Sequence, residues 1–285
     1  ETVVIEGVNA NAGINETLTI NLDQSAAVTK VEIKNYASDD TDDDTFTVEG
    51  ISTSTGVTLT DATSNSATTS DNNLTITYDA VTGTADSSTI TLNSNTSATT
   101  FGTITAAGIE TLTIDAIGGT DSTYALTAAA AKTLNITAAA GSGGTASVTA
   151  GNATAVNITA ADDFTLTDTS LGKVFTYTID STLAAVGTTA ASTVTATDIT
   201  PTVTTGSDTL KFTVKGAGLA TIDSDANWGV QSTSNGDTIE VDASANTGGV
   251  TVNFGGHGTN NARYNKFTGG SGADEAQIQA GGLDK

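Results

Sequence analysis

A repeat of about 22 residues constrains the fold of this chain more than any other feature of its sequence. Apolar pairs separated by one residue recur with first members 22, 22 and 21 residues apart, at Leu112/Ile114, Leu134/Ile136, Val156/Ile158 and Tyr177/Ile179. Secondary pairs lie between them, at Tyr124/Leu126, Ala146/Val148 and Phe164/Leu166. Each repeat therefore holds two short strands, and repeats of this length are typical of stacked arrays in which each unit contacts only its neighbours.

The segments between the apolar pairs favour a β-solenoid over a leucine-rich repeat. A leucine-rich repeat needs Asn or Cys at a fixed place, and its return segment is commonly helical. Here the return segments consist of Ala, Gly, Ser and Thr, and the segment 137–144 is too rich in Gly for a helix. The alanine run 128–131 leaves two alternatives open, namely one helical turn or a corner lined by small side chains.

Residues 1–104 show a different pattern, in which apolar residues alternate with Thr or charged residues. This alternation is typical of half-buried strands, and it occurs at 2–5, 17–22, 28–33, 45–48, 57–59, 74–78 and 89–92. Clusters of Gly, Asn, Asp and Ser separate these segments, which favours a β-sandwich. The predicted fold class is therefore all-β, with an N-terminal β-sandwich-like region followed by a β-solenoid of about 22-residue repeats.

Three domains follow from these patterns. We predict a β-sandwich-like domain at 1–104, solenoid repeats at 105–200 and a C-terminal β region at 201–285 that ends in a single calcium-repeat-like turn. The second boundary is placed at Pro201, the single proline of the chain, because it breaks the rhythm. Strands are expected beyond it at 209–214, 238–241 and 250–254.

Charge and composition exclude several classes of function. The chain has 9 Lys and Arg against 32 Asp and Glu, a formal net charge of -23, which repels nucleic acid and attracts cations. It has no apolar stretch long enough to span a membrane, so we expect neither nucleic acid nor membrane insertion. Because Cys is absent and His257 is the single histidine, thiol nucleophiles and multi-histidine metal sites are excluded. We therefore predict that the chain is not an enzyme.

The strongest local motif lies near the C-terminus. Gly269, Gly270, Gly272 and Asp274 match the calcium-binding nonapeptide Gly-Gly-x-Gly-x-Asp-x-U-x, with Ala276 at the apolar U position. Glycines allow backbone carbonyls to turn toward an ion, and the Asp carboxylate supplies a hard anionic oxygen. We predict a Ca²⁺ site here, and a plain Gly-rich turn is the alternative.

A second candidate metal site is the acidic segment 39–44. It holds five carboxylates, which repel one another unless a cation or water separates them, at Asp39, Asp40, Asp42, Asp43 and Asp44. It lacks the central Gly and the closing Glu of an EF-hand, so an EF-hand is excluded. Surface binding of calcium and a solvated acidic loop both remain open. The pairs Asp162-Asp163 and Asp223/Asp225 are weaker versions of the same pattern.

Three segments together resemble the surface-layer (S-layer) and RTX-type calcium-repeat proteins that Gram-negative bacteria export by type I secretion. They are residues 105–114, the strand pattern at 132–137 and the closing motif at 269–274. The resemblance implies an extracellular location at the bacterial cell surface, bound Ca²⁺, and copies of the chain itself as partners in a lattice or fibre. Cell-surface polysaccharide is a further expected partner.

The function expected from this resemblance is that of a structural module of a self-assembling, calcium-stabilised surface layer. Two alternatives stay open. One is a stalk or ligand-binding segment of a secreted RTX adhesin, and the other is a polysaccharide-acting β-helix enzyme.

Overall fold

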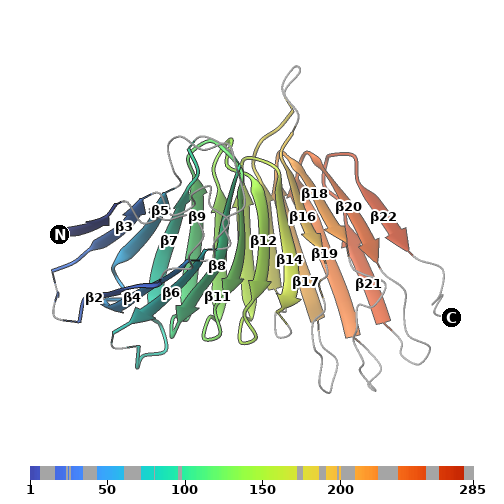
Figure 1. Ribbon diagram of the computed structural model, residues 1–285. Coiled ribbons are helices and arrows are strands. Elements are labelled where there is room, and N and C mark those ends of the chain that lie inside the picture. Colours follow the sequence, from blue (N-terminus) through green and yellow to red (C-terminus); the bar gives the residue numbers. More distant parts are fainter. Residues whose placement is uncertain are drawn as a thin grey trace.

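The chain folds as an elongated parallel β-solenoid, seen here in a computed structural model (Figure 1). The structure describes residues 1–6, 17–23, 25, 27–34, 44–60, 72–79, 81–95, 98–171, 176–185, 191–197, 199, 209–223, 237–254 and 263–278. Within these ranges all regular structure is strand, and no helix is present that is long and apolar enough to cross a membrane. The N-terminal and C-terminal strands lie at opposite ends of the solenoid (Figure 1).

Two parallel sheets of 11 strands form the body. One contains the odd-numbered strands β1 Thr2–Ile5, β3 Lys30–Lys34, β5 Gly56–Thr60, β7 Ser87–Asn93, β9 Thr111–Ile117, β11 Thr133–Ala138, β13 Ala155–Ala160, β15 Thr176–Ser181, β17 Thr209–Gly216, β19 Asp237–Asn246 and β21 Arg263–Thr268. The other contains β2 Thr17–Asn21, β4 Thr45–Ile51, β6 Asn73–Tyr78, β8 Thr99–Ala107, β10 Ser122–Thr127, β12 Gly144–Thr149, β14 Phe164–Ser170, β16 Thr193–Thr197, β18 Leu219–Asp223, β20 Gly249–Phe254 and β22 Glu275–Ile278. We call one odd strand and the following even strand a rung.

The 22-residue repeat is confirmed as the rung length in the middle of the chain. Leu134 of β11 pairs with Leu112 of β9 on one side and with Val156 of β13 on the other. These side chains are fully buried. Equivalent positions of successive repeats therefore stack directly on one another, as a solenoid requires.

The predicted N-terminal β-sandwich is not confirmed. The expected strands exist as β1 to β7, but they join the same two parallel sheets as the later strands. Along the column Val3, Val31, Val57 and Ile90, the paired residues are 28, 26 and 33 positions apart. Connections of unequal length hide the repeat from a search for a fixed period, and strand alternation alone does not specify the partner strand.

The sheets also continue past the two expected domain boundaries. β7 pairs with β9 across the first boundary, and β15 pairs with β17 across the second.

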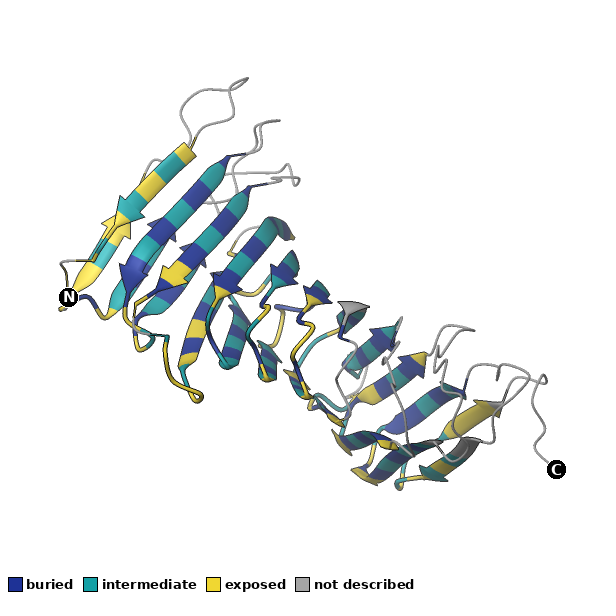
Figure 2. Cartoon of the chain, turned by 90° about the horizontal axis from the view of Figure 1, so that it is seen from below, coloured by how far each residue is buried: buried dark blue, intermediate teal, exposed yellow. Residues whose placement is uncertain are grey.

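The core is the narrow space between the two sheets. Buried and partly exposed residues alternate along the strands (Figure 2), because successive side chains point to opposite faces. Among the largest core side chains, Tyr177 and Phe212 stack with ring centroids 4.9 Å apart. The alanine run is a corner: Ala129 and Ala130 form a turn that is closed by a hydrogen bond from the Ala131 amide to the Ala128 carbonyl at 3.1 Å, and Ala128 and Ala131 are buried.

Inward and outward positions of one strand should differ sharply in their tolerance of charge. Leu134→Asp removes a buried aliphatic side chain, a loss of about 2–5 kcal/mol, and adds an unpaired charge. Asn135→Asp should change stability by about 1 kcal/mol or less, because the side chain faces outward and its oxygen still accepts from Asn157 Nδ2, at 2.9 Å. Urea unfolding of both variants checks this, and equal losses would contradict the solenoid register.

Candidate functional site

The predicted calcium motif forms the corner between β21 and β22, where the chain passes from one sheet to the other. Both oxygens of the Asp274 carboxylate accept backbone hydrogen bonds. Oδ2 accepts from the Gly270 amide at 2.8 Å, within the same corner. Oδ1 accepts from the Val250 amide at 3.0 Å, on the neighbouring strand β20. Asp274 therefore closes its own turn and also ties it to the preceding rung.

The corner lies directly on the corner of the preceding rung. The Ser271 amide donates to the Asn246 carbonyl at 3.1 Å. Asn246 is itself buried: its Oδ1 accepts from the Gly249 amide at 2.7 Å, and its Nδ2 donates to the Gly218 carbonyl at 3.1 Å. Corners of three successive rungs are thus joined by hydrogen bonds that involve main-chain groups.

Close approach of these corners explains the glycines of the motif. A Cβ atom at Gly270 would lie 2.0 Å from the Asn246 carbonyl oxygen, and one at Gly272 would lie 2.4 Å from the Gly249 nitrogen. At Gly269 it would lie 2.6 Å from Asp274 Oδ2. Gly270 and Gly272 therefore have a packing role at this corner, because a Cβ at either position would meet backbone of the neighbouring rung, whether or not an ion binds.

A calcium ion at this corner would draw mainly on main-chain oxygens. Ca²⁺ takes six to eight oxygen ligands, and the carboxylates of this corner are those of Asp274 and Glu275. Throughout the described ranges, no three His, Cys, Asp or Glu side chains gather into a group that could hold a metal ion. Backbone carbonyls and water would have to complete the shell. Calcium binding at Asp274 stays a prediction.

Of the second predicted metal site, the structure describes a single residue. Asp39, Asp40, Asp42 and Asp43 lie outside the described residues. Asp44 directly precedes β4 and is only 2% exposed. Its amide donates to Asn72 Oδ1 at 3.0 Å, and its carbonyl accepts from the Asn73 amide at 2.8 Å. Asp44 is therefore part of the solenoid wall, and calcium binding in the segment before it stays a prediction.

At a third acidic corner, the sequence interpretation noted the pair Asp162-Asp163 but missed Asp121, because Asp121 is far from that pair in the chain. Asp121 precedes β10, Asp163 precedes β14, and the corner before β12 lies between them. Partial desolvation raises the pKa of Asp121, and the charges of Asp162 and Asp163 raise it further. Asp163 Oδ1 accepts from the Thr193 amide at 2.8 Å. The repeat itself was the available signal, since positions 121 and 163 are 42 residues, or about two rungs, apart.

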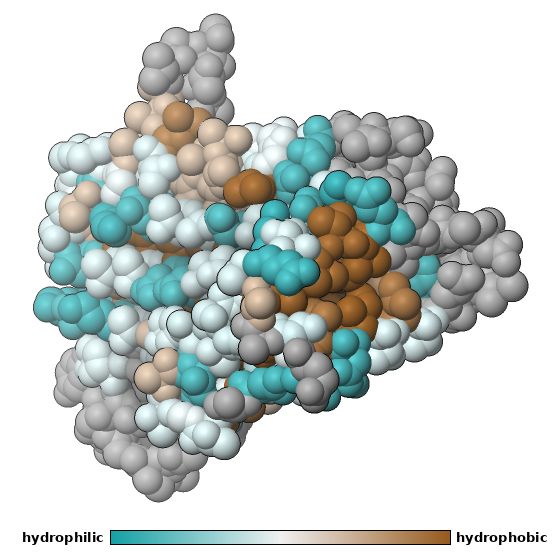
Figure 3. All heavy atoms as spheres, turned by 90° about the vertical axis from the view of Figure 1, so that its left-hand side faces the viewer, coloured by the Kyte–Doolittle hydropathy of each residue, from teal (hydrophilic) through white to brown (hydrophobic). Residues whose placement is uncertain are grey.

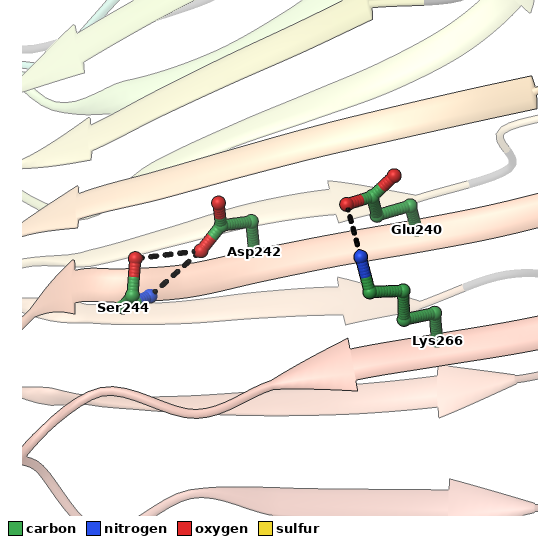
Figure 4. Close-up of polar contacts among 4 residues, drawn as sticks. All are labelled: Glu240, Asp242, Ser244 and Lys266. Carbon is green, nitrogen blue, oxygen red and sulfur yellow. Dashed lines mark hydrogen bonds and ion pairs between the residues drawn. The ribbon is translucent and has the colours of Figure 1, made fainter.

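The outer face of the odd-strand sheet carries an ion pair and a hydrogen-bonded carboxylate near its C-terminal end (Figure 4). Lys266 Nζ of β21 lies 2.9 Å from Glu240 Oε1 on β19, and this hydrogen bond raises the pKa of Lys266. Asp242 Oδ1 accepts from the Ser244 hydroxyl at 2.7 Å and from its amide at 3.1 Å. Those hydrogen bonds lower the pKa of Asp242. These groups are already engaged with one another on the surface.

The outer face of the even-strand sheet presents a straight row of hydroxyl groups. Seven threonines pair in register from β8 to β20, namely Thr100, Thr123, Thr145, Thr165, Thr195, Thr221 and Thr251. Neighbouring strands lie about 4.8 Å apart, so the hydroxyls repeat at close to that spacing. The row is uncharged in a chain of net charge -23, which makes it suited to neutral polar partners.

A shallow hollow on the odd-strand side has a volume of about 290 Å³. Its lining is uncharged and mostly hydroxyl-bearing, formed by Thr53, Ser54, Gly56, Ser87, Ser88, Thr89 and Thr113. None of these side chains is a carboxylate or an imidazole. His257, the single histidine of the chain, lies outside the described residues.

Because the pKa of Asp121 is raised, replacing it by a neutral residue should increase the stability of the fold, by an amount that depends on pH. A carboxyl group whose pKa is higher in the folded than in the unfolded state destabilises the fold when it is ionised. This loss of stability is absent below the ordinary pKa of 3.8 and complete above the raised pKa. Asp121→Asn should therefore raise the unfolding temperature at pH 7 and lose this advantage near pH 3. Asp79→Asn, which removes an exposed charge, is the matched control. Equal gains for both variants at pH 7 would contradict the prediction.

Comparison of this chain with protein-family models, with curated proteins and with solved structures found no match. Its function has to be inferred from its own residues and fold.

Proposed function

We propose that this chain is a structural module of a self-assembling, calcium-stabilised layer on the bacterial cell surface. The observation that carries the proposal is the continuous pair of parallel sheets, in which side-chain rows run unbroken over successive rungs. Such a rod is stiff because each rung is hydrogen-bonded to the next along both sheets. Regular rows on a stiff body provide repeated contact points, which is what a lattice subunit needs.

The chemistry of the surface supports an extracellular structural role. The resemblance of segments 105–114, 132–137 and 269–274 to exported S-layer and RTX-type proteins supports the proposed location at the cell surface. The chain has no Cys that would depend on redox state, and its threonine row offers hydroxyl groups to a neutral polysaccharide of the cell surface. The high negative charge requires cations between neighbouring subunits.

A stalk of a secreted adhesin is the second candidate. The two terminal rungs lie at opposite ends of the rod (Figure 1), which is the arrangement a spacer between two attachment points requires. Electron microscopy of the purified chain in millimolar calcium separates the two roles. A lattice module should form ordered two-dimensional arrays, and isolated rods at every concentration would contradict the proposed function and favour the stalk.

Calcium should stabilise the chain beyond simple screening of its charge. An ion that binds only the folded state adds about 2.7 kcal/mol at a hundred times its dissociation constant. Thermal unfolding is to be measured in millimolar calcium, in chelator, and in sodium chloride of matched ionic strength. We expect a higher unfolding temperature in calcium than in sodium chloride, and identical values would contradict a specific site.

Asp274→Asn tests the location of that site. The variant loses one carboxylate oxygen that accepts a backbone amide, so it should be less stable even in chelator. The diagnostic quantity is therefore the increase in unfolding temperature on adding calcium, which should shrink in Asp274→Asn and stay unchanged in Asp79→Asn. An undiminished increase in Asp274→Asn would place the ion elsewhere.

A further inference from the structure

The odd-strand sheet has a step between β5 and β7. Pairing between these two strands begins at Val57 and Ile90, so residues 87–89 at the start of β7 have no paired residue in β5. On their other side, the same residues pair with residues 111–113 of β9. β7 therefore has a short open edge at an internal position of the sheet, and its residues 87–89 line the hollow of about 290 Å³.

The turn between β4 and β5 is held away from this edge. The Thr55 amide, which would be next in the ladder toward β7, donates instead to the Ser52 carbonyl at 2.9 Å. Thr55 Oγ1 donates to the Val28 carbonyl at 2.9 Å, and the Gly56 amide donates to the Thr29 carbonyl at 3.1 Å. Both acceptors lie directly before β3. The turn therefore packs on the preceding rung and leaves a hollow between itself and β7.

The open edge presents main-chain groups to the hollow. In a parallel ladder, successive residues direct their N–H and C=O groups alternately to the two neighbouring strands. The Thr111 amide of β9 donates to the Asp86 carbonyl at 2.9 Å. Since Asp86 faces β9, the N–H and C=O of Ser87 face the other way, toward the hollow. A ligand there can reach both a main-chain donor and a main-chain acceptor.

The side chains around the hollow add oriented hydroxyl groups. Thr113 Oγ1 accepts from Asn135 Nδ2 at 3.3 Å, and Asn135 Oδ1 accepts from Asn157 Nδ2 at 2.9 Å. Because this row of side chains donates toward Thr113, the hydroxyl hydrogen of Thr113 is left to donate to a ligand. In the turn on the opposite wall, Ser54 Oγ lies 3.0 Å from Ser52 Oγ. The hollow therefore offers hydroxyl groups whose positions are fixed before a ligand binds.

The chemistry of the lining selects the class of ligand. Apart from Gly56, the lining residues are Ser and Thr, so a charged ligand meets no opposite charge, and the net charge of -23 repels anions. Peptides that bind a strand edge also need pockets for their side chains, and this lining has no aliphatic or aromatic residue. Beside the apolar residues at the end of the rod, the described surface in Figure 3 is mostly hydrophilic. A neutral sugar, whose hydroxyls both donate and accept, matches this lining.

We propose that the hollow between β5 and β7 binds one neutral sugar residue of a polysaccharide. The main chain of Ser87 and the hydroxyls of Ser54 and Thr113 are the groups that hold it. A single sugar residue is small and the hollow is shallow, so its dissociation constant is on the order of 1 mM. A polysaccharide that contacts many copies in a layer binds more tightly through multivalency. The role of the site rests on the proposed function, because a surface layer lies against the polysaccharides of its own cell.

Gly56 allows the hollow to be filled without disturbing the fold. A Cβ atom at Gly56 would meet nothing within 4 Å, and the same holds at Gly151 in the exposed corner between β12 and β13. Gly56→Leu therefore blocks the hollow, and Gly151→Leu is its matched control. Thr113→Val removes one hydroxyl and keeps the shape of the side chain. Circular dichroism and urea unfolding check that each variant keeps the solenoid.

Binding is to be followed by NMR of the backbone amides of the isotope-labelled chain. The probes are maltotetraose, cellotetraose and mannotetraose, each added to tens of millimolar. We expect saturable shifts at Gly56 and Ser87 with at least one probe. Gly56→Leu should weaken binding about tenfold or more, and Gly151→Leu should bind like the unmodified chain. Thr113→Val should weaken binding about three- to tenfold, the usual effect of losing one neutral hydrogen bond.

Several outcomes would overturn the proposal. One is the absence of shifts at the hollow with all three probes, and another is equally tight binding of an acidic oligogalacturonate. Shifts confined to the threonine row would place sugar binding on the other sheet. Tighter binding of an uncharged tripeptide of Ser and Thr at residues 87–89 would show that the open edge accepts a peptide strand instead.

The site and the proposed function can fail separately. Electron microscopy of the unmodified chain tests the layer, and NMR tests the hollow. Sugar binding without ordered arrays would uphold the site and overturn the layer. Ordered arrays without sugar binding would uphold the layer and overturn the site.

Discussion

The whole structure depends on in-register parallel pairing between successive rungs. Each inward side chain is covered by the equivalent side chain of the rung before and after it, as Leu134 is by Leu112 and Val156. The core is thin and contains few aromatic residues, so its burial comes from repetition and not from large side chains.

The corners of the rungs concentrate the polar chemistry of the chain. At the C-terminal corners, glycines allow main-chain groups to approach closely, and Asn246 and Asp274 accept the amides that would otherwise lack partners. At the corners before β10 and β14, stacking brings Asp121 near Asp162 and Asp163, which raises the pKa of Asp121. Both results have one physical cause, since a solenoid places equivalent corners directly above one another. Gly270 and Gly272 of the motif are therefore required for packing, and an ion would add to a corner that is already hydrogen-bonded.

The distribution of charge and hydroxyl groups on the surface fits the proposed assembly of copies with cations between them. Most of the -23 net charge lies outside the terminal strands, whose edges are apolar or slightly basic. The sides of the rod carry rows of threonine and scattered ion pairs such as Lys266 with Glu240. Contacts between the acidic sides of two copies therefore need cations between them. The proposed surface layer depends on contacts of this kind.

The sequence by itself determined most of the strands, which side of each of these faces inward, and the rung length between residues 112 and 179. It did not identify β8, β16, β18, β21 and β22 as strands. These are local properties, because alternation and a constant period are visible within a few tens of residues. Partner strands in the N-terminal region were decided only by the tertiary structure, since rungs offset by 28, 26 and 33 residues have no constant period. Likewise, the proximity of Asp121 to Asp163 and the double role of Asp274 depend on which corners stack. Pairing between distant segments is a property of the assembled sheets, and a strand's own residues do not encode its neighbour.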